Sequence, residues 1–347
     1  MEGSRFIDFS KELMEFIDES PSAFHVTANF AEMLKKNGYS QLNEQDKWNL
    51  LPGEKYYVTR NGSSIIAFCI PKNNKISNFQ IAAAHSDSPA FKIKENPEMV
   101  EDNRYLSLNV EKYGGMITQS WFDRPLGAAG RIVCDVDGIL DSILVNISEP
   151  SFIIPSLAIH MTRGNDASKT GISVQKEMQP VAADKGLYEL IRKEFGIKQS
   201  DILGTDLYLY NTQEGCIMGE NASLISAPRI DDLQCVYSTM TGFIQTRCQD
   251  KPERDEYIKV YAAFDNEEVG SSTRQGAAST FLADTLERIQ EAFGGSASDY
   301  RRLIAGSMML SADNAHAVHP NYPEKACPSN RPLVNQGVVI KFSGNQR

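Results

Sequence analysis

The sequence predicts an α/β domain that is interrupted by a β-rich insertion. Stretches with helical spacing of apolar residues alternate with short apolar runs near both ends of the chain, whereas the middle contains only strand-like runs separated by turns. A chain of 347 residues with 41% hydrophobic residues can form one large domain or two ordinary ones. We therefore expect residues 1–96 and 226–347 to form one discontinuous domain, and residues 97–225 to form the insertion.

The first ninety residues predict two helices followed by strands. One helix face is indicated by the spacing of Phe6, Phe9, Leu13, Phe16 and Ile17. A second amphipathic helix is predicted in "ESPSAFHVTANFAEMLKKNG", where Gly38 would end it. The dipeptide Asn61-Gly62 in "YYVTRNGSSIIAFCI" predicts a hairpin, and "NFQIAAA" predicts a strand that runs into His85.

The insertion and the last third of the chain differ in their patterns. In the insertion, "YLSLNVEKYGGMITQSWFD", "RIVCDVDGILDSILVNI" and "DLYLYNTQ" indicate short strands, with turns at Gly114-Gly115 and Asp137-Gly138. After about residue 225, "RIDDLQCVYSTMTGFIQT" and "STFLADTLERIQEAF" have helical spacing, and "YIKVYAAF" and "MMLSAD" indicate strands. The helix-and-strand alternation of the first domain thus returns after the insertion.

Composition excludes several classes of function. A net charge of −10 argues against a nucleic-acid partner, because phosphate binding needs clustered Lys and Arg. The longest apolar runs are too short to span a bilayer, and the N-terminus does not resemble a signal peptide, so we expect no membrane partner and a cytoplasmic location. The six cysteines form no C-x-x-C pair, so we expect reduced, buried thiols and no thiolate zinc site.

Three predicted strands end in side chains that bind metal ions. The residues are His85 and Asp87 after "QIAAA", Asp265, Glu267 and Glu268 after "VYAAF", and Asp313 after "MMLSA". One acid at a strand end is as often a turn residue, but ligands of open α/β sheets bind beyond the carboxyl ends of the strands. Clustered carboxylates repel one another unless a cation offsets their charge, and a mixed imidazole and carboxylate set suits zinc, manganese or cobalt.

Two adjacent pairs of acids leave their roles open at this point. Asp231 and Asp232 begin a predicted helix, where one could bridge two metal ions or both could simply interact with the helix dipole. Glu267 and Glu268 lie in one turn and can point apart, one to a metal ion and the other to an attacking water.

Six motifs together resemble one known family. They are "HSDSP" (85–89), "WFDRPLGAAGR" (121–131), "LAIHMTR" (157–163), "APRIDDL" (227–233), "FDNEEVGS" (264–271) and "SADNAHAVHPNY" (311–322). Their identity and order resemble the M18 metallopeptidases of the aspartyl aminopeptidase group. The likeness extends from about residue 15 to the last residue.

The resemblance implies a fold and a set of roles. The fold would be a zinc-peptidase-like mixed sheet flanked by helices, with an inserted β-rich dimerisation domain, and dimers would assemble into a larger tetrahedral complex. Two zinc ions per subunit, with manganese or cobalt as other options, would be bound by His85, Asp231, Glu268 and Asp313. Asp87 would orient the imidazole of His85, and Glu267 would be the general base.

Two further residues are candidates for contacts with the peptide substrate. A lone histidine such as His160 is more often structural, but by resemblance it would reach the active site of a neighbouring subunit. Lys341 is either an ordinary solvated lysine or a cation that recognises an acidic first residue of the peptide. The preference for acidic over neutral N-terminal residues is open at this stage.

The leading hypothesis is a two-metal aminopeptidase that removes N-terminal residues from peptides, and acidic residues (Asp or Glu) are the expected substrates. The family continues beyond the segment matching "GVVIKFSGNQR" and supplies a last metal-binding histidine there, so one alternative is a catalytically impaired homologue or an assembly component. Another alternative is a two-metal phosphoesterase, which would need Arg or Lys side chains around the phosphate.

Overall fold

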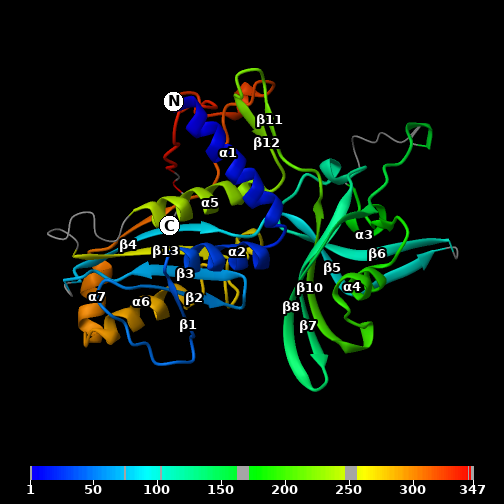
Figure 1. Ribbon diagram of the computed structural model, residues 1–347. Helices are drawn as coiled ribbons and strands as arrows, with labels where there is room; N and C mark the ends of the chain where they lie inside the picture. Colours follow the sequence, from blue (N-terminus) through cyan, green and yellow to red (C-terminus); the bar gives the residue numbers. More distant parts are fainter. Residues whose placement is uncertain are drawn as a thin grey trace.

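A six-stranded mixed sheet lies beside a closed barrel in the computed structural model, which describes residues 2–73, 76–101, 104–161, 172–246, 256–342 and 344 (Figure 1). The sheet has the order β1-β2-β3-β13-β4-β14. Its strands are β1 (Ser40–Leu42), β2 (Lys55–Arg60), β3 (Ser64–Cys69), β4 (Asn78–His85), β13 (Tyr257–Phe264) and β14 (Met308–Ser311). Strands β13, β4 and β14 run parallel, whereas β2, β3 and β13 pair antiparallel, so the sheet is mixed.

The hairpin predicted at Asn61-Gly62 is confirmed. Strands β2 and β3 pair antiparallel on either side of it, and both turn residues have positive φ values, of 55° and 69°. Asn and Gly adopt this backbone region at the lowest cost, which is why the dipeptide is a reliable hairpin signal.

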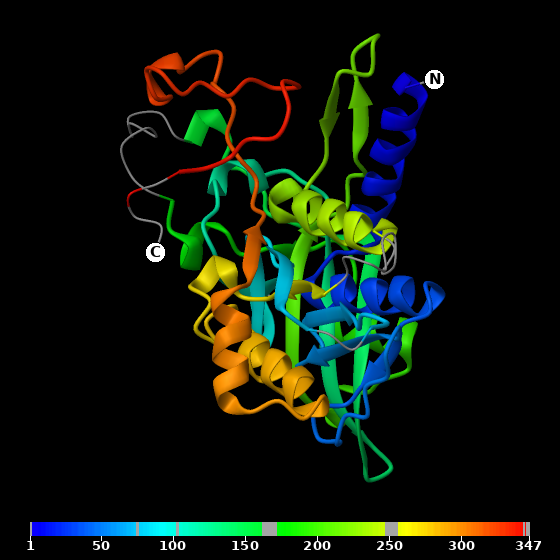
Figure 2. The same cartoon turned by 90° about the vertical axis from the view of Figure 1, so that its left-hand side faces the viewer.

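Helices cover both faces of the sheet (Figures 1 and 2). On one face lie α1 (Glu2–Glu19), α2 (Ala23–Lys36) and α5 (Ile230–Gln245), whose apolar side chains share a core with β2, β3 and β13. On the other face lie α6 (Phe281–Ala292) and α7 (Ala297–Ala305). Helix α7 was not predicted; its sequence signal is the capping box between Ser296 and Asp299. Burial on both faces explains why β3 and β13 are almost continuously apolar.

The barrel has its own apolar core. Its order is β10-β5-β6-β9-β8-β7, with strands β5 (Ala90–Glu101), β6 (Tyr105–Tyr113), β7 (Leu126–Val136), β8 (Ile139–Ile153), β9 (Val181–Ala182) and β10 (Ile202–Asn211). Alternate residues of these strands point inward, among them Phe91, Leu108 and Ile132. Helix α4 (Leu187–Phe195) adds Leu187, Leu190 and Ile191 to this core, and the single turn α3 (Val174–Glu177) lies near β6.

The barrel strands span Ala90 to Asn211, a segment shifted toward the N-terminus from the predicted insertion at 97–225. The short strands β11 (Cys216–Met218) and β12 (Leu224–Ser226) form a separate two-stranded sheet. The division into a catalytic and a dimerisation domain stays a prediction.

The cysteines depart from the expectation of reduced, buried thiols. Cys134 is free and buried, but the free thiols of Cys216 and Cys327 are exposed, because they lie on the small hairpin and in the C-terminal segment, away from the cores. Cys69 is disulfide-bonded, and Cys248 lies outside the described residues. In the part of the chain that the structure describes, no helix has the length and apolar character needed to cross a membrane.

Candidate metal centre

The carboxyl ends of β4, β13 and β14 meet at one edge of the sheet. Phe264 at the end of β13 pairs with His85 at the end of β4, and Ser311 at the end of β14 pairs with Ala83. The residues that follow these strands therefore begin at the same level, facing the barrel (Figure 1). This is the place where open α/β sheets bind ligands.

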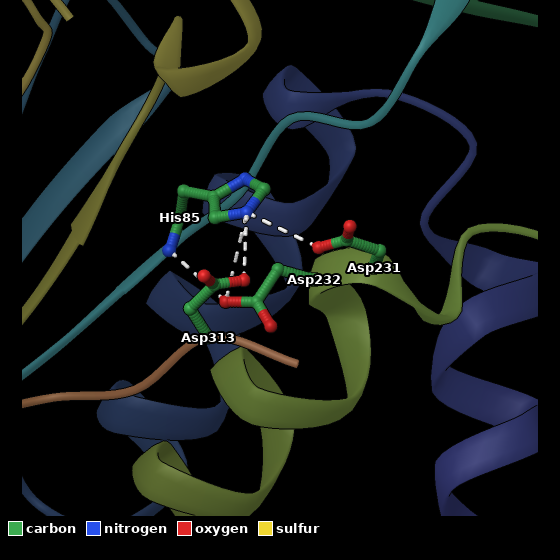
Figure 3. A group of neighbouring side chains, drawn as sticks. All are labelled: His85, Asp231, Asp232 and Asp313. Carbon is green, nitrogen blue, oxygen red and sulfur yellow. Dashed lines mark hydrogen bonds and ion pairs between the residues drawn. The ribbon is translucent and has the colours of Figure 1, made fainter. Parts of the chain in front are cut away.

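Four side chains converge at this edge (Figure 3). They are His85, Asp231, Asp232 and Asp313, whose candidate ligand atoms all lie within 4.8 Å of one another. His85 Nε2 is 3.4 Å from Asp231 Oδ1, 3.9 Å from Asp232 Oδ2 and 4.0 Å from Asp313 Oδ1. Three of the four predicted ligand positions are thus side by side, with Asp232 in addition.

Asp232 is the buried acid of this group. Its side chain is fully buried, and Oδ2 accepts a 3.4 Å hydrogen bond from the backbone N–H of His85. Oδ1 has no hydrogen-bond partner of good geometry among the described residues, although the nearby Cys235 thiol offers a weak donor. Burial raises the pKa of Asp232 to about 7. An unpartnered carboxylate oxygen beside two further carboxylates fits a bound cation, so the residues present suit a divalent metal ion.

No pattern in the sequence distinguishes Asp232 from Asp231. Both residues lie at the start of α5 but have non-helical backbone angles, with ψ values of 108° and 25°. They therefore do not act as ordinary first-turn acids, and their carboxylates reach His85 instead.

Asp87 contacts the imidazole of His85 at Nδ1, the ring nitrogen that does not face the acids. His85 Nδ1 is 3.1 Å from the backbone oxygen of Asp87 and 3.3 Å from its Oδ1. With Nδ1–H donating to these acceptors, Nε2 is the ring nitrogen that faces the acids, where it carries either a proton or a metal ion. Burial lowers the pKa of His85, but the hydrogen bonds and charges of Asp231, Asp87 and Asp232 outweigh it and raise the pKa to about 11. A metal ion would replace this proton at Nε2, since ligation needs the neutral imidazole.

The turn that carries Glu267 and Glu268 is fixed on the same carboxylate. In the 3-10 turn η4 (Glu267–Val269), the N–H of Glu267 donates to Asp87 Oδ1 and the N–H of Glu268 donates to Oδ2, both at 3.2 Å. Glu268 Oε2 accepts a 3.2 Å hydrogen bond from the backbone N–H of Gly115 in the barrel. Burial, with the charges of Asp87 and Asp231, raises the pKa of Glu268. Its role as a ligand, and that of Glu267 as a base, stay predictions.

Lys341 lies at the outer side of the group, whereas His160 lies in the insertion. Lys341 Nζ donates 2.8 Å hydrogen bonds to Asp313 Oδ2 and to the backbone oxygen of Asn314. His160 is exposed in the short 3-10 turn η2 (Ile159–Met161). The predicted substrate contacts of both residues are not tested by these positions.

A cavity of about 810 Å³ lies next to the centre, between the sheet edge and the barrel. Asp87 and Asp231 line it from the side of the sheet, and Tyr113, Trp121 and Tyr208 line it from the barrel. The space is large enough for several residues of a peptide, and it reaches two acids of the site.

Comparison with known proteins identifies the family. The model of the family described as aminopeptidase I zinc metalloprotease (M18) matches residues 16–347. The chain belongs to the M18 family. An M18 family aminopeptidase of Clostridium acetobutylicum is 42% identical over 98% of this chain and 80% of its own length. The aspartyl aminopeptidase of Dictyostelium discoideum is 35% identical over 99% of this chain and 80% of its own length.

Solved M18 structures have the same fold. A cryo-EM structure of the Ape4 and Nbr1 complex matches with a TM-score of 0.89 and 33% identity, over 97% of this chain and 69% of that one. The S. cerevisiae mApe1 dodecamer matches with a TM-score of 0.83 and 28% identity, over 95% of this chain and 76% of that one. This M18 chain is therefore a metallo-aminopeptidase with the family's mixed α/β fold. The resemblance expected from the six motifs is confirmed.

Proposed function

We propose that this aminopeptidase uses two zinc ions to remove acidic residues, Asp or Glu, from the N-termini of peptides. The observation that carries the proposal is the convergence of one imidazole and three carboxylates beside a cavity, with Asp87 behind the imidazole. Zinc is supported by the family description, and manganese or cobalt would suit the same donors.

Each residue would have a distinct task in the reaction. His85, Asp231, Glu268 and Asp313 would hold the metal ions, and the fully buried Asp232 would add negative charge beneath them. When bound there, zinc ions would lower the pKa of a water molecule and polarise the scissile carbonyl group. Glu267 would accept the proton of that water and pass it to the leaving amine. Asp87 would fix the position of His85 relative to the Glu267-Glu268 turn, since it contacts both.

The preference for an acidic residue is supported by Lys341. Its ammonium group lies 2.8 Å from Asp313, and its side chain is 35% exposed, so it can reach a substrate beside the metal site. Once Asp313 binds a metal ion, the side-chain carboxylate of the first substrate residue would replace Asp313 as the partner of the Lys341 ammonium group. The relative from Dictyostelium discoideum, an aspartyl aminopeptidase, supports the same substrate class.

Assembly and location complete the proposal. The mApe1 relative is a dodecamer, which supports a homo-oligomer. In the assembly that we propose, dimers built through the insertion form a tetrahedral complex, and His160 reaches a neighbouring active site. We also place the protein in the cytoplasm. A phosphoesterase and an inactive assembly component are not favoured, since the family model and the curated relatives are aminopeptidases.

The test is turnover of matched peptides by the zinc-loaded protein. We expect an N-terminal aspartyl peptide to have a kcat/KM about 10 to 100 times that of the alanyl peptide, which is the worth of one charge-assisted hydrogen bond. Lys341→Ala should remove most of this difference and leave the alanyl rate unchanged. Equal rates for both peptides would refute the acidic preference, and hydrolysis of a phosphate ester without peptide cleavage would refute the aminopeptidase.

A further inference from the structure

The carboxylate of Asp87 is nearly saturated with partners. Its Oδ1 accepts from the N–H of Glu267 and lies 3.3 Å from His85 Nδ1, and its Oδ2 accepts from the N–H of Glu268 and the hydroxyl of Tyr113, so three hydrogen bonds and one ion pair meet at this carboxylate. A carboxylate offers about four lone-pair sites, so this one is nearly filled and cannot rotate without losing bonds. Asp87 is 4% exposed, so water cannot replace a lost donor easily.

The shortest of these bonds comes from the barrel. Tyr113, the last residue of β6, lies 2.6 Å from Asp87 Oδ2, whereas the amide donors lie at 3.2 Å. A short hydrogen bond from a hydroxyl to a carboxylate is about twice as strong as one between neutral groups. Among the described hydrogen bonds of Asp87, the one from the phenol is thus the shortest.

The direction of the Tyr113 hydroxyl is set by Asn266. Thr273 Oγ1 and Gln275 Nε2 both donate to Asn266 Oδ1, at 2.7 and 2.8 Å, which leaves the amide NH₂ of Asn266 to donate to Tyr113 Oη at 2.9 Å. A hydroxyl that accepts from Asn266 keeps its own hydrogen for Asp87. The chain of donors therefore runs from Thr273 and Gln275 through Asn266 and Tyr113 to Asp87.

We propose that Tyr113 is a positioning residue through which the barrel sets the affinity of the metal centre. This inference rests on the proposed metal site. Tyr113 holds Asp87 in the rotamer that pairs with the His85 ring and accepts from both backbone amides of the Glu267-Glu268 turn. Two residues after Tyr113, just beyond the end of β6, the N–H of Gly115 donates a hydrogen bond to Glu268 Oε2. The barrel segment 113–115 thus contacts both Asp87, which orients His85, and Glu268, a predicted metal ligand.

The test is Tyr113→Phe, which removes the hydroxyl and keeps the ring. The ring packs edge-on against Tyr208, with centroids 5.2 Å apart, so the phenylalanine variant should fold. We expect its zinc affinity, measured by competition with a chelating dye, to be about 10-fold lower, since partners of ligand-orienting groups usually contribute 10- to 100-fold. The cobalt-loaded variant should also show a changed visible absorption spectrum.

A matched control separates positioning from stability. Tyr57→Phe removes another buried phenol hydroxyl, which donates to Gln41 at 3.1 Å far from the centre on β2. Both variants should lower the melting temperature of the metal-free protein by similar amounts, but Tyr57→Phe should bind zinc as wild type does. Equal zinc affinity of wild type and Tyr113→Phe would overturn the inference.

A second variant tests the direction of the relay. Asn266 has a positive φ of 64°, which glycine tolerates, so Asn266→Gly deletes the amide without backbone strain. Both side chains act through one hydroxyl. The double variant, Tyr113→Phe with Asn266→Gly, should therefore lose no more zinc affinity than the single variant that binds zinc more weakly. Additive losses of zinc affinity would contradict the relay. If the wild-type chain bound no zinc at all, the proposed metal site itself would be refuted, which differs from equal binding by wild type and variant.

Discussion

The two halves of the metal centre differ in how they are held. The inner half lies at the ends of the central strands β4 and β13 and includes His85 and Asp87, which are 6% and 4% exposed. The outer half consists of Asp231 and Asp313, whose side chains are 56% and 52% exposed. Hydrogen bonds with defined partners fix the inner half, whereas the outer half has mainly ionic contacts. Preorganisation of the site therefore resides in the inner half, and the outer half depends on the bound cation for its final geometry.

The position of each strand in the sheet explains this difference. Strands β4 and β13 are neighbours within the sheet, with helices on both faces, so the residues at their ends are shielded. Strand β14 is at the edge of the sheet, and all four of its residues are exposed. An acid that follows an edge strand remains in contact with water and is screened by it.

The largest expected effect concerns Glu267, whose amide is fixed by the inner half while its side chain is exposed. Glu267→Gln should lower kcat on the order of 100-fold or more, because the side-chain amide of glutamine cannot accept a proton from water. Zinc content, measured by elemental analysis, should not change, since Glu267 is not expected to bind the metal. A variant with near-normal turnover would show that another group is the base.

A smaller effect is expected for Asp87→Asn, which changes the inner half. The side-chain NH₂ of asparagine would replace one carboxylate oxygen and would face N–H or O–H groups that now donate to that oxygen. The imidazole of His85 would then be held less well, so zinc affinity should fall about 10- to 100-fold. The melting temperature of the metal-free protein should fall as well, because a buried donor is left without an acceptor.

The matched change in the outer half is Asp313→Asn. It should also weaken zinc binding, but it should change the free energy of unfolding of the metal-free protein by no more than about 1 kcal/mol, as is usual for exposed ion pairs. Equal losses of metal-free stability in the two variants, measured by urea denaturation, would remove the distinction between the halves.

The smallest expected effect on metal binding concerns Lys341, which pairs with Asp313 at 2.8 Å. A metal ion must displace this ammonium group from Asp313 Oδ2. Lys341→Ala should therefore raise zinc affinity by up to about 5-fold, the range of an exposed ion pair. Isothermal titration with zinc would measure the change, and a weaker affinity would mean that Lys341 supports the site instead of competing for it.

Sequence patterns predicted the elements that carry the inner and outer halves better than the contacts between them. The apolar runs before His85 and Asp313 have the length of strands, and the structure places both residues at one sheet edge. Asp232 could not be separated from Asp231, because the difference between them lies in local backbone angles.

Tyr113 was missed for a different reason. In "LSLNVEKYGG" it fits a half-buried strand, and nothing nearby in the sequence indicates that it meets Asp87. The contact joins the barrel to the sheet edge, and Asn266 lies 153 residues further along the chain. Such tertiary hydrogen bonds leave no periodic signal.

Gly114 constrains how this barrel could be exchanged in chimeric enzymes. It has a φ of 76°, and a β-carbon at this position would lie 2.6 Å from Glu268 Oε2 and 2.7 Å from Glu268 Cβ. Any larger residue would push Glu268 out of place while adopting an unfavourable backbone conformation. A barrel grafted from another protein would therefore preserve the centre only if its own turn had glycine at the position of Gly114. The turn after β6 and Glu268 must come from the same parent protein in such a chimera.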